Sequence, residues 1–417
     1  MTAPPRPASG APRLPIRTAQ GVLAATFALH ALQASAPYGL PALLPFVRSD
    51  LGGGYFEAAL VSSAFLLGIV AGSPIAGGAV DAFGVRRSIV GGTALATVML
   101  ALVPGAPSLW LVCTLLAVAG IGYSVLTPGT NTAMLGWFAH RHRATAAGIK
   151  QTGVSAGGIA VASFVPAVSL AWGWQASFHV IALFYAAAFA IAWITLLDGP
   201  SGPAPRAARP SLRDAIAAML GDRPTMLLAA DGFLRVGIQY AFLTYLIAYA
   251  IDSLHSPVAW GALIYALAHL FGAVGRVGWG WASDRVFHGR RRGPYAAIAI
   301  TAAAGFALLA LAAPLHWAFL LGSVALLGLS AAGFQGVGLS LLAEVGGARA
   351  GTASGLVNAL SFLGAAVMVP LCGQLLDAGA SFATLFGVLA AMSVVTAAIT
   401  LALPSTTDGA PVVHAAR

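Results

Sequence analysis

Long apolar runs alternate with short polar segments along the whole chain. A helix needs about 20 apolar residues to cross the hydrocarbon core of a bilayer. Prolines and glycines inside such runs are tolerated, because the freed backbone groups find partners within the bundle. The pattern predicts an all-α integral membrane protein with twelve transmembrane helices, over residues 20–46, 55–80, 88–107, 109–138, 147–170, 177–197, 226–250, 258–282, 294–313, 317–343, 350–375 and 381–403.

One polar segment is longer than the others. Residues 198–225 are rich in proline, glycine and arginine, and they separate the first six runs from the last six. The first run is too long for the apolar core of a signal peptide and lacks an obvious cleavage site, so we expect a retained helix. The predicted parts are a tail (1–19), a six-helix bundle (20–197), a linker (198–225), a second six-helix bundle (226–403) and a second tail (404–417).

The amount and placement of charge agree with this organisation. Only 8% of the residues are charged, against about 25% in soluble proteins, so most of the outer surface must face lipid. If the helices alternate in direction, almost all arginines fall on one side of the membrane, and Arg48 is the one lysine or arginine on the other. By the positive-inside rule both termini are cytoplasmic, in the inner (plasma) membrane. The formal charge of +9 therefore reflects topology and not a nucleic-acid-binding surface.

The two halves of the chain repeat one another. Residues 77–87 read GGAVDAFGVRR and residues 280–292 read GWASDRVFHGRRR, which aligns two positions at an offset of 203 residues, Gly77 with Gly280 and Asp81 with Asp284. A second match, at an offset of 207 residues, pairs Thr145, Gly148 and Gly157 with Thr352, Gly355 and Gly364. Offsets near half the chain length indicate duplicated six-helix halves.

The first of these loops resembles the signature loop of the major facilitator superfamily, Gly-x-x-x-Asp-Arg-x-Gly-x-Arg-Arg. The matching residues are Gly77, Asp81, Gly84, Arg86 and Arg87. Ala82 stands where the family often has a basic residue, and the second copy keeps Asp284 and Arg285 with one extra residue before its basic run. The resemblance covers the whole chain. It implies two pseudo-symmetric bundles that rock about a midplane site, and loop residues that form a conformational latch for the outward-open state. The alternative for the loops is a plain surface ion pair, worth about 0–1 kcal/mol.

Charged groups at membrane depth are costly, so they mark candidate functional sites. Arg276 lies within the eighth run, and its guanidinium can bind a carboxylate through two parallel hydrogen bonds. The segment is similar to the organic-anion branches of the superfamily, such as the monocarboxylate and oxalate/formate carriers, which implies that Arg276 contacts an anionic substrate. Monocarboxylate carriers often have an Asp one turn earlier, where this chain has Gly272. A snorkelling or helix-packing arginine is the alternative.

Two further cations are candidates for substrate binding. Arg235 follows Asp231 by one helical turn, so this pair either satisfies itself or faces the cavity as a proton-linked pair. Lys150, the only lysine of the chain, opens the fifth run and can reach the cavity or the headgroups. The candidates for proton coupling are Asp231, His30 and His269, since histidine titrates near neutral pH. Each histidine can equally be a neutral, hydrogen-bonded core residue.

Polar side chains in the same runs can hydrogen-bond either a solute or another helix. The candidates for substrate binding are Tyr123, Tyr240, Gln335 and Asn358, with Gln33, Tyr38, Asn131 and Ser361 as further possibilities. Catalysis is not expected, because the sequence has no phosphate-binding loop and no HExxH or GxSxG. Cys113 and Cys372 lie in apolar runs without a metal-site spacing. We therefore expect neither an enzyme nor a cofactor nor a bound metal.

Together these features predict a monomeric secondary transporter in the lipid bilayer. Its expected substrate is a small organic anion, such as a monocarboxylate or an aromatic acid, and protons are the expected coupling ion. Two alternatives stay open. One is a proton-driven exporter of hydrophobic or drug-like compounds, although the Gly-Pro signature that such exporters carry in span five is absent. The other is a solute sensor that does not transport, which would often carry an added cytoplasmic domain.

Overall fold

The computed structural model describes residues 18–138, 143–195, 217, 220–311, 316–346 and 350–404. Most of the predicted tails and of the predicted linker therefore lie outside the described residues. The described part is helical and contains no β-strand.

The helices follow the predicted runs closely. The first half consists of α1 (Ala19–Gln33), α2 (Ser35–Leu51), α3 (Tyr55–Phe83), α4 (Val85–Leu102), the short η1 (Val103–Gly105), α5 (Leu109–Tyr123), α6 (Leu126–Trp137), α7 (Arg143–Trp172) and α8 (Trp174–Thr195). The second half consists of α10 (Arg223–Ala248), the π-helical η3 (Tyr249–Ser253), α11 (Val258–Arg285), α12 (Arg292–Leu311), α13 (Trp317–Leu329), α14 (Gln335–Gly346), α15 (Ala350–Asp377) and α16 (Phe382–Leu401).

Three of the predicted runs are divided rather than continuous. The first is interrupted at Ala34, between α1 and α2, and the fourth between α5 and α6. The tenth is interrupted at residues 330–334, between α13 and α14. Among the described residues, ten helices are long and apolar enough to span a membrane, and α13 is a shorter apolar helix. When each divided run is counted as one crossing, the described helices make the twelve crossings that the sequence predicts.

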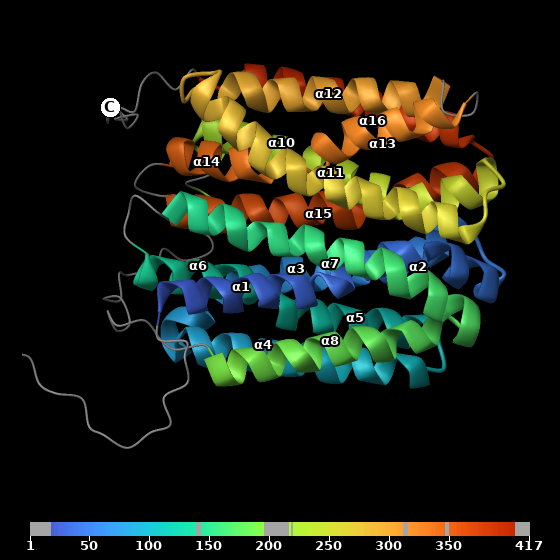
Figure 1. The fold of residues 1–417 in the computed structure, drawn as a ribbon, viewed down its shortest axis with the longest axis horizontal. Helices are drawn as coiled ribbons and strands as arrows, with labels where there is room; N and C mark the ends of the chain where they lie inside the picture. Colours follow the sequence, from blue (N-terminus) through green and yellow to red (C-terminus); the bar gives the residue numbers. More distant parts are fainter. Residues whose placement is uncertain are drawn as a thin grey trace, which may run out of the picture.

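The two halves stand side by side, with α1–α8 on one side of the bundle and α10–α16 on the other (Figure 1). The helices lie nearly parallel, and α1 begins at the same end of the bundle at which α16 ends. We call this end, which holds Ala19 and Leu401, the terminal end, and the other end the opposite end. This arrangement is an all-α membrane fold built from two related six-helix halves.

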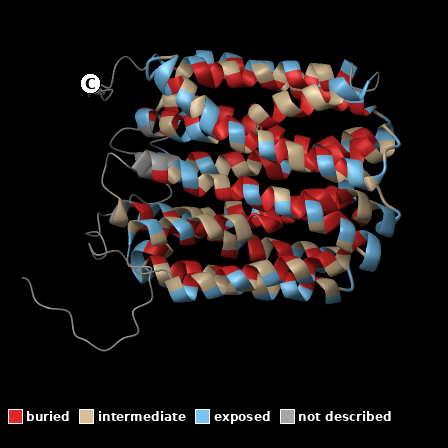
Figure 2. Ribbon diagram, viewed as in Figure 1, coloured by how far each residue is buried: buried red, intermediate tan, exposed pale blue. Residues whose placement is uncertain are grey.

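Exposed tryptophans mark two levels on the outside of the bundle. Four lie near the opposite end and two near the terminal end: Trp110, Trp172, Trp260 and Trp317, and Trp193 and Trp281. Tryptophan is enriched at the two membrane–water interfaces. Many leucine, isoleucine and valine side chains are also exposed, and exposed and buried positions alternate around the outer helices (Figure 2). This surface is that of a multi-pass membrane protein.

The halves meet along three helix pairs, α3 with α15, α7 with α11 and α2 with α10. The first two pairs are equivalent under the internal repeat, so the interface is pseudo-symmetric. Small residues allow close approach within each half as well. At Gly364 of α15, for example, an added Cβ would lie 2.0 Å from the Phe233 carbonyl oxygen of α10.

Charged residues join the two halves at the opposite end. Asp377, at the end of α15, accepts hydrogen bonds from the main-chain N–H groups of Tyr55 and Phe56, both at 2.8 Å. These N–H groups begin α3, so its dipole favours the carboxylate. Arg48 of α2 pairs with Asp252 at 3.2 Å, and the Tyr55 hydroxyl donates to the same carboxylate at 2.6 Å. We call these five residues the opposite-end lock.

Candidate functional site

Two of the interrupted crossings are interrupted at equivalent places in the two halves. The break after α5 starts at Ser124 and the break after α13 at Ser330, an offset of 206 residues that matches the internal repeat. In the second break, the Leu329 carbonyl accepts a hydrogen bond from Trp279 Nε1 of α11 at 3.0 Å. Irregular backbone within a membrane is tolerated where it is buried in protein or lines a cavity. The breaks therefore identify the middle of the bundle as the candidate site.

Arg276 of α11 lies beside the second break and is buried, with 7% of its surface exposed. Its Nε donates to the Ala332 carbonyl at 3.3 Å, and its Nη1 donates to the Gln151 carbonyl of α7 at 2.7 Å. The second bond crosses from one half of the protein to the other. Tyr38, Tyr123 and Tyr240 lie around the guanidinium. A charged side chain thus sits where the two halves meet.

No acidic side chain of the described residues neutralises Arg276. Asp231 is the only buried acidic residue in the described ranges, and both of its oxygens accept hydrogen bonds from Arg235. A buried ion without a partner of opposite charge is costly. The arrangement is therefore suited to a ligand that brings a negative charge.

Lys150 of α7 supplies a second buried cation, from the first half of the protein. Only 1% of its surface is exposed. Its ammonium group donates to the Asn131 side-chain oxygen and, at 3.3 Å, to the Thr130 hydroxyl. That hydroxyl also bonds His30 Nε2 of α1 at 3.0 Å. His30, Thr130 and Lys150 therefore form one chain of hydrogen bonds, so the structure joins two of the predicted residues.

Aromatic rings connect the two halves beside Arg276. Tyr38 of α2 stacks on Tyr240 of α10 with ring centroids 5.8 Å apart. His269 of α11 packs edge-on against Tyr38 and Tyr265, at 4.8 and 4.9 Å. The Tyr265 hydroxyl donates to the Tyr38 carbonyl at 2.7 Å, again from one half to the other. These rings form an aromatic wall contributed by both halves.

Several polar atoms near these groups are buried without a hydrogen-bond partner in the described part of the chain. They are His30 Nδ1, Gln151 Oε1, Ser155 Oγ and His269 Nε2. Buried polar groups are normally paired, and each unpaired one in a native protein calls for an explanation. A bound polar ligand would provide one. His30 lies near both Lys150 and Arg276, and His269 lies near Arg276. We call the region of these four residues and the three tyrosines the central cluster.

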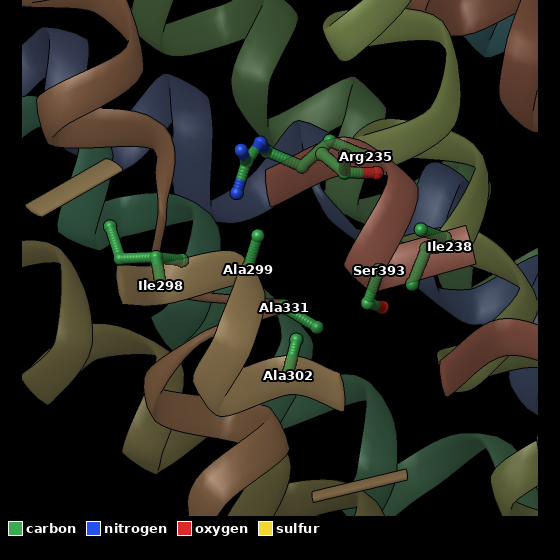
Figure 3. Close-up of a pocket in the computed structure, with 8 residues that line it drawn as sticks. Arg235, Ile238, Ile298, Ala299, Ala302, Ala331 and Ser393 are labelled. Carbon is green, nitrogen blue, oxygen red and sulfur yellow. The ribbon is translucent and has the colours of Figure 1, made fainter. Parts of the chain in front are cut away.

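Arg235 and Asp231 do not belong to the central cluster. They form an ion pair inside the second half, with the Arg235 Nη2 to Asp231 Oδ1 distance at 2.9 Å. The Thr400 hydroxyl donates to Asp231, and the Arg235 guanidinium lies 3.8 Å from the centre of the Tyr295 ring. A small pocket lies beside Arg235, lined mainly by apolar residues such as Ile298 together with Ser393 and Thr396 (Figure 3). Arg235 and Asp231 therefore neutralise each other, which is one of the two arrangements that their spacing of one helical turn allowed.

Other predicted ligands have different surroundings. Gln335 is half-buried at the start of α14, and Asn358 is exposed on α15; neither hydrogen-bonds the central cluster within the described residues. Gln33 donates to Thr93 at 3.0 Å inside the first half, and Ser361 donates to the carbonyl one turn earlier in its own helix. These positions remain predictions as contacts to a substrate.

Comparison with known proteins decides the family. The sequence profile of the Major Facilitator Superfamily matches residues 23–367. The chain belongs to this superfamily. Its structure is similar to a bacterial homologue of the human lysosomal transporter Spinster in an inward-facing and unoccupied conformation, with a TM-score of 0.66, 16% identity, and coverage of 92% of this chain and 95% of the other. A mutant of the peptide transporter POT gives a TM-score of 0.71 at 16% identity, with coverage of 91% and 93%. At these identities the likeness shows the fold alone.

Two relatives are similar in sequence. A probable chloroplastic anion transporter of Oryza sativa subsp. japonica is 32% identical over 148 residues, which cover 35% of this chain and 28% of that protein. A hexuronate transporter of Bacillus subtilis (strain 168) is 23% identical over 256 residues, or 58% of this chain and 59% of that protein. The chain therefore matches less than two thirds of the length of either relative.

The two superfamily signature loops lie at the terminal end. Gly84 ends α3 with a φ of 83°, a conformation that favours glycine. Arg86 Nη2 donates to the Trp193 carbonyl near the end of α8 at 2.7 Å. Arg292, which is 206 residues further on, donates to the Leu403 carbonyl after α16 at 2.9 Å. The repeat therefore extends to two arginines that each hold the carbonyl end of a helix.

The remaining loop residues are exposed at the terminal end. The Asp284 carboxylate pairs with Arg291, which also contacts Glu344 at 3.2 Å. Arg285, Arg87 and Asp81 are exposed, and Gly77 is half-buried. The role of these loops as a conformational latch remains a prediction.

Asp252, Asp377 and Ser155 are not among the residues that the sequence predicts for a site. The opposite-end lock depends on Asp252 and Asp377, whose positions at the ends of apolar runs could have drawn attention, since that side of the membrane has almost no basic residue to pair with them. Ser155 lies in a run of small residues and looks like part of a packing surface. Its missing hydrogen-bond partner becomes evident only in the structure.

Proposed function

We propose that the chain is a secondary transporter that carries a small organic anion, a monocarboxylate or an aromatic acid, across the inner membrane. The proposal is supported by membership of the superfamily and by the names of the two relatives, an anion transporter and a hexuronate transporter. Both termini are proposed to be cytoplasmic, on the basis of the arginine distribution.

The burial of Arg276 without an acidic partner among the described residues is the observation that best supports an anionic substrate. Its buried guanidinium donates to two main-chain carbonyls, and no carboxylate of the described residues reaches it. Neutral carbonyls compensate a full positive charge only in part. A substrate carboxylate would replace them with charge-assisted, bidentate hydrogen bonds. Lys150 adds positive potential from the first half.

The position of Arg276 at the seam between the halves supports alternating access. A site that both halves build can be exposed first on one side and then on the other when the halves rock. His30 is the proposed proton carrier, because it shares the Thr130 hydroxyl with Lys150. A proton on His30 would add a second positive charge beside Lys150, which would favour binding of the anion.

The test is uptake into proteoliposomes from a panel of organic acids, with and without a pH gradient. Leaving one charge of a buried pair alone costs about 2 kcal/mol or more, so Arg276→Ala should lower uptake by about 30-fold or more. Arg223→Ala, which removes an exposed arginine at the start of α10, serves as the control and should leave uptake unchanged.

Full anion uptake by the Arg276→Ala protein would overturn the anion site. Resistance to drug-like compounds on expression, without uptake of any organic acid, would instead favour the exporter. Uptake that is the same with and without a pH gradient would overturn the proposed proton coupling.

A further inference from the structure

One face of α7 lies against α11 at the seam between the halves. Gln151, Ser155 and Gly158 recur on this face at helical spacing. The Gln151 carbonyl accepts from Arg276, which fixes one end of the contact. At the other end, a Cβ added to Gly158 would lie 2.3 Å from His269 Nδ1, so the imidazole ring packs directly on the α7 backbone. Ser155 lies between these two fixed points.

This seam contains three buried polar atoms that lack a hydrogen-bond partner in the described residues: Gln151 Oε1, Ser155 Oγ and His269 Nε2. Ser361 and Ser393 are buried in helices, and each donates to the carbonyl four residues earlier. Ser155 is 1% exposed and makes no such bond. The buried Ser62, Ser63 and Ser88 also lack a partner in the described part of the chain, so Ser155 is distinguished by the two further unpaired atoms in the same seam. Burying a hydroxyl without a partner is unfavourable, so the three atoms together point to a ligand that satisfies them.

The chemistry of the three atoms defines what that ligand must offer. The Gln151 oxygen can only accept a hydrogen bond, whereas the serine hydroxyl can donate or accept one, and the histidine nitrogen does either according to its tautomer. A ligand hydroxyl matches this set, because it donates and accepts at once. An unsubstituted alkyl chain or phenyl ring would leave all three atoms unpaired.

We propose that the α7–α11 seam is a subsite for hydroxyl groups, in which Gln151 and Ser155 select hydroxylated organic acids over their deoxy analogues. The inference rests on the proposed function, since Arg276 holds the carboxylate of the same molecule. The substrate class is thereby narrowed to hydroxy acids, including sugar acids. Gln151 and Ser155 determine specificity, and His269 closes the subsite from the other half.

The experiment compares pairs of acids that differ in their hydroxyl groups: lactate with propionate, mandelate with phenylacetate, and gluconate with hexanoate. The dissociation constant of each acid is measured by thermal-shift titration of the purified full chain in detergent. The hydroxylated member should bind at least about 10-fold more tightly, because a site with buried polar groups disfavours a ligand that leaves them unpaired.

The variants locate the effect. Ser155→Ala and Gln151→Met should weaken binding of the hydroxylated acid, so that the two acids of a pair have dissociation constants with a ratio close to one. Ser163→Ala, two turns further along α7 at an exposed position, should leave the ratio unchanged. Arg276→Ala should weaken both members of a pair equally.

The possible results separate the two proposals. If acids bind but the two members of every pair have equal affinity, the subsite is wrong and the organic-anion function survives. A preference for the hydroxylated member that persists in both the Ser155 and Gln151 variants would also overturn the subsite. If no acid of any pair binds, the proposed function fails, and the subsite fails with it.

Discussion

Replacing Asp377 with asparagine should weaken one of the contacts of the opposite-end lock, the one between α15 and the start of α3. The Asp377 oxygens accept from two N–H groups at the start of α3, both at 2.8 Å. Asparagine keeps one acceptor but turns an NH₂ group towards the second N–H donor, and it also removes the negative charge from the positive end of the helix dipole.

The expected cost can be worked out from these contacts. A hydrogen bond to a charged group contributes about 1.5–3 kcal/mol, and a charge at a helix terminus about 0.3–1 kcal/mol. Both bonds lie at an exposed edge, where water can replace them in part. We therefore expect a loss of about 1–2 kcal/mol. If the protein works by the proposed alternating access, this loss would change the ratio of closed to open molecules at this end by about 5- to 30-fold.

Distances between spin labels can measure this ratio. Pro107 and Ala259 are exposed at the opposite end, one in each half. Both are replaced by cysteine and spin-labelled, in a chain whose two native cysteines have been removed. Asp50→Asn is the matched control. Asp50 lies at the same end and accepts from Trp174 Nε1 at 2.8 Å and Gln175 Nε2 at 3.2 Å, both within the first half. An unchanged distance distribution in the Asp377→Asn protein, or an equal change in the control, would refute the reasoning.

Two further predictions concern stability in detergent, measured as the midpoint of thermal unfolding. Asp231→Leu should destabilise the protein by about 3–5 kcal/mol, because it leaves the Arg235 guanidinium buried without its partner. The double variant Asp231→Leu/Arg235→Met should recover most of this loss. Equal losses in the single and the double variant would contradict a self-satisfied pair. Gly364→Ala should cost about 1–3 kcal/mol, because its Cβ would lie 2.0 Å from the Phe233 carbonyl oxygen. Gly355→Ala on the same helix has open space around the new Cβ and should cost little, so similar midpoints for the two glycine variants would be inconsistent with this packing.

The number and order of the membrane crossings could be predicted because hydropathy depends on long stretches of side chains. The interruptions inside the crossings could not. The break at residues 330–334 lies in an apolar, glycine-rich stretch whose composition also suits a continuous membrane helix. Likewise, α2 continues through Pro41 and Pro45 to Leu51, beyond the expected end at residue 46. Such features depend on the neighbours of the main chain.

The charged and titratable residues of the candidate site could be predicted from the sequence. Arg276, Lys150, His30 and His269 are ionisable groups within apolar runs, and the structure places them in one cluster. The partners of Arg276 are main-chain carbonyls, which every residue carries, so no residue type in the sequence could indicate them. For Arg235 the spacing allowed either a self-satisfied pair or a pair facing the cavity. Only the hydrogen bonds that Arg235 and Thr400 donate to Asp231 distinguish the two.

Within the opposite-end lock, the contact between Asp377 and the start of α3 tolerates mutation unequally on its two sides. The α3 side donates through main-chain N–H groups, which every amino acid except proline presents at positions 55 and 56. The α15 side depends on one carboxylate, Asp377. Sequence drift can therefore abolish this contact easily from the second half and hardly at all from the first. Among descendants of this chain, a change in the strength of the contact would arise mainly by substitution at residue 377.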